Sequence, residues 1–217
     1  TVRRDRSSRF APEFRTAIFP AVSAGWVVSK EGFLANSQAI TFAKLRVGWG
    51  QTGNQEIGNY NAFSTFATSP ESSFYDIAGS RTSSQPGYEL GQFGNAKAKW
   101  ETTTSINAGF DMTLWGGKFD IAFDWFDRRT TDMLFPVEVQ FTQGVATNPF
   151  QNIGEMQNTG VELGLNYRGK SGEFSYTIGA NFSTYKNTVI KTNGDPKTQY
   201  FGFSNLRLPT GTVSVTQ

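Results

Sequence analysis

The feature that most constrains this chain is a nearly unbroken alternation of polar and apolar residues over residues 100–135. Side chains on a β-strand point alternately to its two faces, so such a segment has one apolar and one polar face. The first arm places its larger apolar residues at even positions: Trp100, Ile106, Phe110, Met112 and Leu114. After Gly116-Gly117 the second arm places them at odd positions: Phe119, Ile121, Phe123 and Trp125. This pattern predicts a β-hairpin closed by a two-residue glycine turn.

The length of the two arms indicates the class of protein. They have about 15 to 18 residues each, whereas an ordinary strand has about 5 or 6. Long alternating strands are typical of an outer-membrane barrel, in which apolar side chains face lipid and polar ones face the lumen. Asp127 and Arg129 follow Trp125 on the apolar face, so we expect the second arm to leave the bilayer there.

The rest of the chain predicts an all-β, antiparallel, up-and-down transmembrane barrel wall of about seven strands. Besides the two arms, the expected strands are residues 1–6, 18–29, 41–51, 156–169 and 173–187. Long connections at 52–97, 136–155 and from 188 alternate with short ones at 30–39, 116–117 and 169–172. We therefore expect the short turns in the periplasm and the long connections outside. Seven strands are too few to close a barrel, so the remaining wall is expected in sequence outside this chain.

Composition excludes several kinds of function. The 217 residues include no His and no Cys, which rules out His-based acid–base chemistry, Cys nucleophiles and the common zinc sites. The net charge of +2 gives no reason to expect a nucleic-acid partner. No apolar stretch is long enough for a transmembrane helix. Residues 1–6 are charged and lack a start methionine, so we expect no signal peptide and read the chain as an internal piece.

Several segments, in the same order, resemble the SusC/RagA family of TonB-dependent outer-membrane transporters of Bacteroidetes. Residues 44–57 read KLRVGWGQTGNQEI, a run similar to a signature of that family. Residues 3–10 read RRDRSSRF, where the family has RRDGSSRF, and residues 19–26 read FPAVSAGW. Residues 99–102 read KWET, and residues 152–162 read NIGEMQNTGVE. The matches extend over nearly the whole chain.

The resemblance implies a barrel of about 22 strands with an internal plug. It implies TonB-driven uptake of glycans or peptides, a SusD-like surface lipoprotein as lid, and a homodimer of the transporter–lipoprotein pair. Residues 1–217 would then form part of a single multi-pass barrel domain in contact with outer-membrane lipid. The plug, the TonB box and the last strand would lie outside this chain. We expect no enzymatic activity, no catalytic residues, no cofactor and no metal.

The charged residues on the expected polar face are candidates for the barrel lumen: Lys44, Arg46, Glu101, Asp111, Asp120 and Asp124. A paired-carboxylate enzyme would use similar residues. Ordinary lumen polarity is the preferred interpretation, because an Arg or Lys on the lipid face costs about 2–4 kcal/mol at mid-bilayer. We expect Lys44 and Arg46 to pair with these carboxylates or to contact the plug. The glycines of residues 48–53 do not form a phosphate loop, since the Lys-Ser/Thr ending is missing.

The long connection 52–97 holds the candidates for contact with a partner or substrate. Asn54 and Gln55 follow a strand end and suit a turn or a lid contact. The aromatic candidates are Tyr60, Phe63, Phe66, Phe74, Tyr75 and Tyr88. Such side chains suit sugar stacking and interface anchoring, but they would equally pack the loop upon itself. The tryptophans are expected in the wall, with Trp26 and Trp49 facing lipid and Trp115 in an interfacial girdle.

Three functions remain open at this point. The preferred one is outer-membrane import of an oligomeric nutrient through a plugged barrel. The second is a structural role as a barrel subunit of a larger envelope complex. The third is a soluble β-sandwich adhesin, which the strand lengths disfavour because its apolar faces would have to be buried between two sheets.

Overall fold

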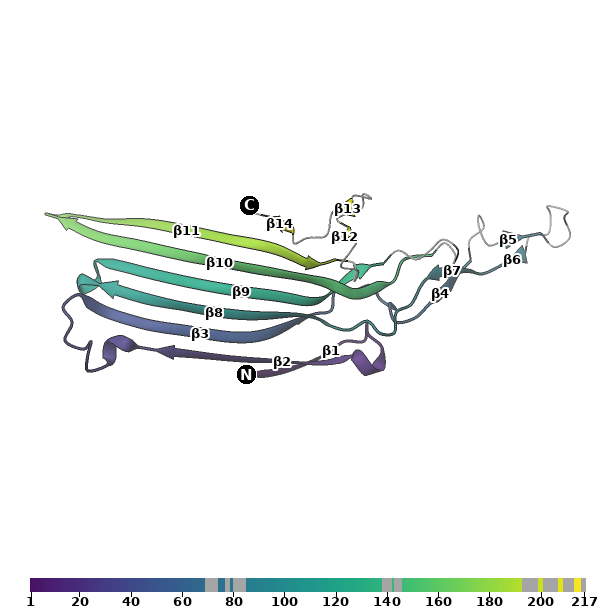
Figure 1. Ribbon diagram of the computed structural model, residues 1–217, viewed down its shortest axis with the longest axis horizontal. Helices are drawn as coiled ribbons and strands as arrows, with labels where there is room; N and C mark the ends of the chain where they lie inside the picture. The colour runs from purple at the N-terminus through teal and green to yellow at the C-terminus, as the bar shows by residue number, and fades with distance from the viewer. Residues whose placement is uncertain are drawn as a thin grey trace.

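The computed structural model of this protein is built around one antiparallel sheet of eight strands in the order β1-β2-β3-β8-β9-β10-β11-β14 (Figure 1). It describes residues 1–68, 74–76, 79, 85–137, 142 and 146–192, with the backbone alone for residue 74 and for 199–200, 207–208 and 213–215. Within these residues the sheet is open, with β1 at one edge and β14 at the other. No helix in the described part of the chain is long and apolar enough to cross a membrane.

All seven predicted strands are present, and each pairs with its neighbour in the sequence. They are β1 (Val2–Arg6), β2 (Thr16–Trp26), β3 (Ile40–Asn54), β8 (Glu101–Leu114), β9 (Phe119–Pro136), β10 (Phe150–Ser171) and β11 (Phe174–Lys191). The eighth strand, β14 (Val213–Val215), returns from the region predicted to be a loop and pairs with β11. A single sheet on this scale is not the two-layer packing of a β-sandwich, so the described residues give no support to the adhesin interpretation.

The long connections carry short ribbons that the sequence did not reveal. Strand β4 (Thr65–Ala67) pairs with β7 (Glu89–Gln92), and β5 (Phe74–Tyr75) pairs with β6 (Gln85–Pro86). Strand β12 (Gln199–Tyr200) pairs with β13 (Arg207–Leu208). The described residues also include the short 3-10 helices η1 (Pro12–Phe14), η2 (Val28–Lys30) and η3 (Trp115–Gly117). Figure 1 shows the β4–β7 and β5–β6 ribbons extending beyond one end of the sheet, opposite the end where the short turns lie.

Both tight turns differ from the prediction. Leu114 pairs with Phe119, so the β8–β9 turn has four residues, 115–118, and not two. Its backbone is left-handed at Trp115, Gly116 and Gly117, with φ of 51°, 66° and 91°. In the β10–β11 hairpin, pairing continues to Ser171 and Phe174, which leaves a turn of residues 172–173 in place of 169–172. The first turn is longer because its left-handed run starts one residue earlier, at a tryptophan.

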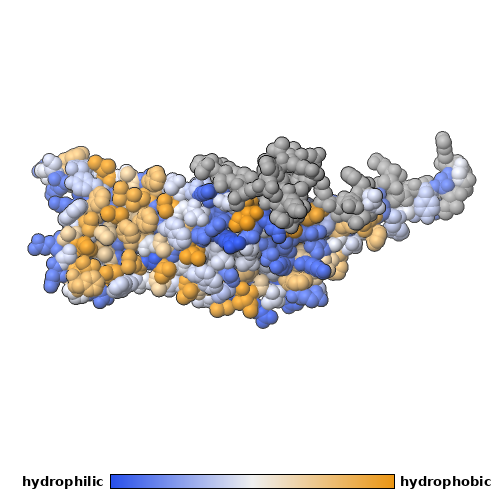
Figure 2. Space-filling view, viewed as in Figure 1, coloured by the Kyte–Doolittle hydropathy of each residue, from blue (hydrophilic) through white to orange (hydrophobic). Residues whose placement is uncertain are grey.

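The sheet has two chemically different faces, as the alternation predicts. One, called the apolar face below, carries hydrophobic side chains, many of them exposed, from six adjacent strands, β2, β3, β8, β9, β10 and β11. These include Val22, Trp26, Leu45, Val47, Trp49, Ile106, Tyr167, Ile178 and Phe182. Phe110 and Phe123 pair across β8 and β9 on this face, with ring centroids 5.5 Å apart. Hydrophobic residues gather over the end of the sheet where the short turns lie, while hydrophilic ones increase towards the other end (Figure 2).

The apolar face becomes polar just beyond Trp125, where the sequence predicts the change. Asp127 accepts hydrogen bonds from Gln157 Nε2 at 2.9 Å and from Thr159 Oγ1 at 3.1 Å. Arg129 forms an ion pair with Glu155. These side chains continue the parity of the apolar residues, so the strands extend past the apolar band as a polar wall.

A small hydrophobic cluster lies at the long-connection end of the sheet. Its buried members are Phe10, Phe19, Ile57, Ala98 and Trp100. Trp100 was expected on the lipid face, and this prediction is wrong. It precedes β8, the residue is only 8% exposed, and its ring packs against Phe10 and Phe19 at centroid distances of 5.4 and 5.7 Å. Its indole nitrogen donates to the carbonyl of Arg15 at 3.2 Å, which fixes the β1–β2 connection to the start of β8.

Candidate functional site

The polar face holds an ion cluster that spans three strands. Arg46 of β3 donates from Nε to Asp111 of β8 at 2.8 Å and from Nη2 to Asp124 of β9 at 3.0 Å. Gly109 stands between Arg46 and Asp124 in the register, because it pairs with both. A Cβ at Gly109 would lie 2.4 Å from Asp124 Oδ1, so the glycine leaves the space in which this carboxylate meets the guanidinium. Only a residue with the reach and fork of arginine binds both carboxylates at once.

Lys44 lies beside this cluster but does not join it. It pairs with Asp111 in the register, yet Arg46 already occupies that carboxylate. The lysine stem lies over Gly25 of β2, with Cε 3.1 Å from the position of a Cβ there. Arg46 makes the pairing that was expected of it, whereas Lys44 makes no ion pair within the described residues, so the other alternative for Lys44, a contact with the plug, stays a prediction.

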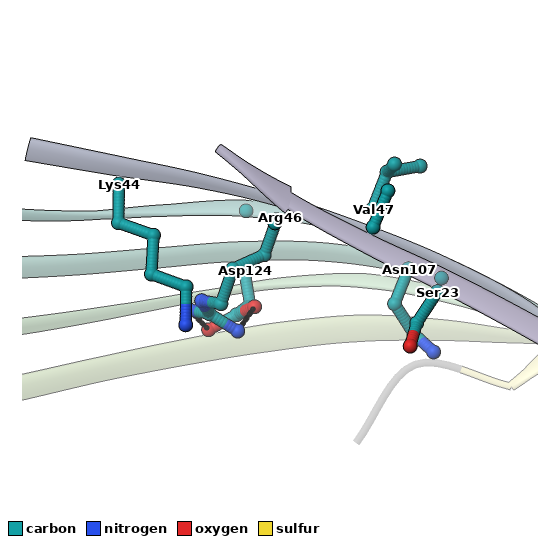
Figure 3. Close-up of a pocket in the computed structure, with 10 residues that line it drawn as sticks. Ser23, Lys44, Arg46, Val47, Asn107 and Asp124 are labelled. Atoms are coloured by element: carbon teal, nitrogen blue, oxygen red, sulfur yellow. Dashed lines mark hydrogen bonds and ion pairs between the residues drawn. The ribbon is translucent and has the colours of Figure 1, made fainter. Parts of the chain in front are cut away.

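Two adjoining hollows mark this part of the polar face. The first has a volume of about 340 Å³ and is lined by Lys44, Arg46 and Asp124 among others. The second, of about 540 Å³, shares Ser23, Gly48 and Asn107 with the first. Figure 3 shows Ser23, Lys44, Arg46, Asn107 and Asp124 projecting to one side of the strands and Val47 to the other. The hollows are open and are lined by both polar and apolar residues.

The other predicted polar residues are separated along the sheet. Asp120 lies near the short turns, where it pairs with Arg168 at 2.6 Å and accepts from Thr113 at 2.9 Å. Glu101 lies at the opposite end of β8 and accepts from Asn54 Nδ2 at 3.4 Å. The described residues contain no group of three acidic, His or Cys side chains placed to hold a metal ion. Asp111 and Asp124 are therefore the predicted carboxylates that share a partner, the guanidinium of Arg46, while Asp120 and Glu101 have partners of their own.

The predicted contact residues in the long connection fall into two groups. Asn54 and Gln55 hold the end of β3: Asn54 also accepts from the backbone of Glu56, and the carbonyl of Gln55 accepts from Arg9 at 3.3 Å. The described aromatic side chains are all exposed: Tyr60, Phe63, Phe66, Tyr75 and Tyr88. The side chain of Phe74 lies outside the described residues. The exposure of these rings does not favour the alternative that they pack the loop upon itself.

Three asparagines join the two long connections and the strand ends beside them, and of these the sequence pointed only to Asn152, the first residue of the run 152–162. Asn95 Nδ2 donates to the carbonyl of Phe150 at 2.7 Å, and the backbone nitrogen of Phe150 donates to Asn61 Oδ1 at 3.2 Å. Asn152 Nδ2 donates to the carbonyls of Lys99 at 2.8 Å and Asp132 at 2.7 Å. Asn61 and Asn95 lie in a stretch without periodicity, so no sequence signal could have identified them. These hydrogen bonds fix the connection between β3 and β8 to the start of β10.

The chain is similar to known transporters over nearly its whole length. The family model for "TonB dependent receptor-like, beta-barrel" matches residues 1–214. The TonB-dependent receptor P3 of Formosa agariphila is 35% identical over 88% of this chain, and the TonB-dependent receptor SusC of Bacteroides thetaiotaomicron is 31% identical over 93%. The matches cover 18% and 20% of those two proteins, so the chain spans about a fifth of the length of the curated relatives it matches.

The fold is also similar to solved structures of transporters. The RagAB peptide importer in its "closed-closed" state superposes with a TM-score of 0.82 and 25% identity, over 99% of this chain and 23% of that one. The structure of the RagAB peptide transporter gives a TM-score of 0.80 and 26% identity, over 97% and 22%. Proteins of this kind are outer-membrane β-barrels, which accounts for an open sheet with one apolar and one polar face. The chain belongs to the TonB dependent receptor-like β-barrel family.

Proposed function

We propose that this chain is one part of a longer protein, called the parent protein below, that imports oligomeric nutrients across the outer membrane. The cargo is a glycan or a peptide, and energy arrives through TonB. The observation that carries this proposal is the family match over residues 1–214 on a sheet with one apolar and one polar face. Relatives named SusC and RagAB support it, the latter described as a peptide importer.

In this proposal residues 1–217 belong to a single barrel domain. The other strands, the plug and the TonB box belong to the rest of the parent protein. The polar face lines the lumen, and the Arg46 cluster braces β3, β8 and β9 where the plug must be held or released. Lys44, which makes no ion pair within the described residues, is a candidate to meet a carboxylate of the plug. No enzymatic chemistry is required, since the protein provides gated passage.

The long-connection end faces the exterior and meets a surface lipoprotein of the SusD kind. The exposed aromatic side chains between residues 60 and 88 are candidates for contact with this lid or with cargo. Asn54 and Gln55, at the rim, are candidates for the lid. A homodimer of the transporter–lipoprotein pair is compatible with this arrangement.

Deletion of the parent gene in its native host tests the proposal. We expect the cells to lose uptake of one class of oligosaccharide or peptide, and to lose it equally when TonB is inactivated. Complementation with a charge reversal at Arg46 is expected to restore surface levels but not normal uptake. Uptake that is unchanged by the deletion, with an altered envelope, would contradict import and favour the structural subunit.

A further inference from the structure

The turn of residues 58–60 is held at both ends by buried residues. Ile57 is 5% exposed and belongs to the hydrophobic cluster with Phe10 and Trp100. Asn61 is 1% exposed; its Oδ1 accepts from the backbone of Phe150 at 3.2 Å, and its carbonyl accepts from the backbone of Asn95 at 2.6 Å. Three residues between two such anchors have little freedom to move. The turn is therefore preorganised in the absence of any partner.

Tyr60 occupies a backbone conformation that is unfavourable for its residue type. Its φ is 62°, in the left-handed region that a bulky L-residue rarely adopts. Glycine and asparagine tolerate this region best, and the chain has Gly58 and Asn59 immediately before it. The backbone nitrogen of Phe63 donates to the carbonyl of Tyr60 at 2.8 Å, which closes a second turn over residues 60–63 directly after it. A turn alone does not require a tyrosine here, so the strained backbone of Tyr60 indicates that its aromatic ring has a role of its own.

Tyr60 gains little from packing within the described residues, because it is 71% exposed. A Cβ built on Gly58 would meet no atom within 4 Å, so the turn stands clear of its surroundings. Small ligands bind in concave sites lined on several sides. A protruding ring on a rigid base instead fits a pocket on another protein, and tyrosine is among the residues most enriched in the energetic centre of interfaces.

We propose that Tyr60 is an anchor residue whose ring enters a pocket on a protein partner at the long-connection end of the sheet. This inference rests on the proposed function, in which a surface lipoprotein covers that end. The pocket is apolar along the ring and offers a polar group to the phenol oxygen. The strained, doubly anchored turn lets the ring bind without an ordering cost at the moment of association.

The test uses the full-length parent protein in its native host, with an affinity tag for isolation from detergent extracts. The variants are Tyr60→Ala, Tyr60→Gly and Tyr60→Phe, and the matched control is Tyr88→Ala. Tyr88 is another highly exposed tyrosine of the same connection, without a left-handed backbone. The co-purifying surface lipoprotein is quantified per folded barrel, and cargo uptake is measured in the same strains. Tyr60→Gly relieves the strain and Tyr60→Ala retains it, so the pair separates loss of the ring from change in the backbone.

We expect Tyr60→Ala and Tyr60→Gly to lower the recovered lipoprotein by at least about tenfold, as truncation of an interface anchor does. Tyr60→Phe is expected to lower the recovered lipoprotein by less, and Tyr88→Ala is expected to leave it unchanged. Full recovery of the lipoprotein with Tyr60→Ala overturns the inference, and so does a loss of uptake with the complex intact, which would assign the ring to cargo. A fall in the amount of folded barrel also overturns it, because the ring would then pack inside the parent protein. Absence of uptake in the wild type would instead contradict the proposed function.

Discussion

A lysine placed on each face of β11 should have very different consequences. Ala180 lies on the apolar face opposite Leu165, and Asn181 lies on the polar face opposite Gly164. The two residues are adjacent and both exposed, so Ala180→Lys and Asn181→Lys add the same charge at nearly the same depth. Because alanine is small, the first change removes almost no packing, and its cost comes from the charge alone.

The expected magnitude follows from the position of Ala180. The native Lys186 is on the same face six residues further along, which is about 20 Å along the strand and about 15 Å in height at a tilt of about 40°. Since an apolar band is about 25 Å tall, Lys186 lies outside it when Ala180 is near the middle. Lysine at the midplane costs about 2–4 kcal/mol, which lowers the folding equilibrium constant by about 30- to 700-fold. The free-energy cost of Asn181→Lys should be at most a few tenths of the cost of Ala180→Lys.

The assay is denaturant unfolding of the parent protein in phospholipid vesicles, followed by tryptophan fluorescence and by the gel shift of the folded barrel. Ala180→Leu serves as an apolar control and should leave the free energy of unfolding unchanged or slightly higher. Equal costs for Ala180→Lys and Asn181→Lys would refute the assignment of the two faces. A larger cost for Asn181→Lys would reverse it.

Three further outcomes follow from the contacts of particular side chains. Arg46→Met should destabilise the barrel by about 1–2 kcal/mol, because it leaves Asp111 without its bidentate partner. This is more than an exposed ion pair contributes. In the same unfolding assay, the double variant Arg46→Met/Asp111→Asn should recover part of the lost stability. Trp100→Ala should cost about 3–5 kcal/mol and loosen the β1–β2 connection in hydrogen exchange, whereas Trp26→Ala on the apolar face should leave that connection protected. Asn152→Ala should raise hydrogen exchange at residues 97–99 without changing the rest of the sheet; unchanged protection there would contradict the role of its amide.

The alternation of polar and apolar residues was sufficient to predict the strands, their order and their two faces, because successive side chains of any β-strand point to opposite faces. It was insufficient where the backbone departs from a regular strand. Trp100 has the parity of the apolar face but precedes the first residue of β8, so its side chain enters a cluster that only the folded connections create. The β8–β9 turn is longer than its glycines suggested because Trp115 also adopts a left-handed backbone.

Pairing between strands was a second limit. The sequence predicts that Lys44 and Arg46 share a face with the carboxylates, but not which cation binds them. That choice depends on the register of β3, β8 and β9 and on the space left by Gly109, both of which are tertiary properties. The asparagine contacts between the long connections depend in the same way on residues far apart in the sequence.

The most direct test of the account is a spin-label accessibility scan along β10. Single cysteines at residues 155–167 of the parent protein are labelled, the protein is reconstituted in lipid, and collision with oxygen and with a water-soluble nickel complex is measured at each position. We expect oxygen maxima at Val161, Leu163, Leu165 and Tyr167, nickel maxima at the residues between them, and nickel access on both faces from 155 to 159. A scan without alternation, or with oxygen maxima at Glu162 and Asn166, would contradict a membrane wall built in this register.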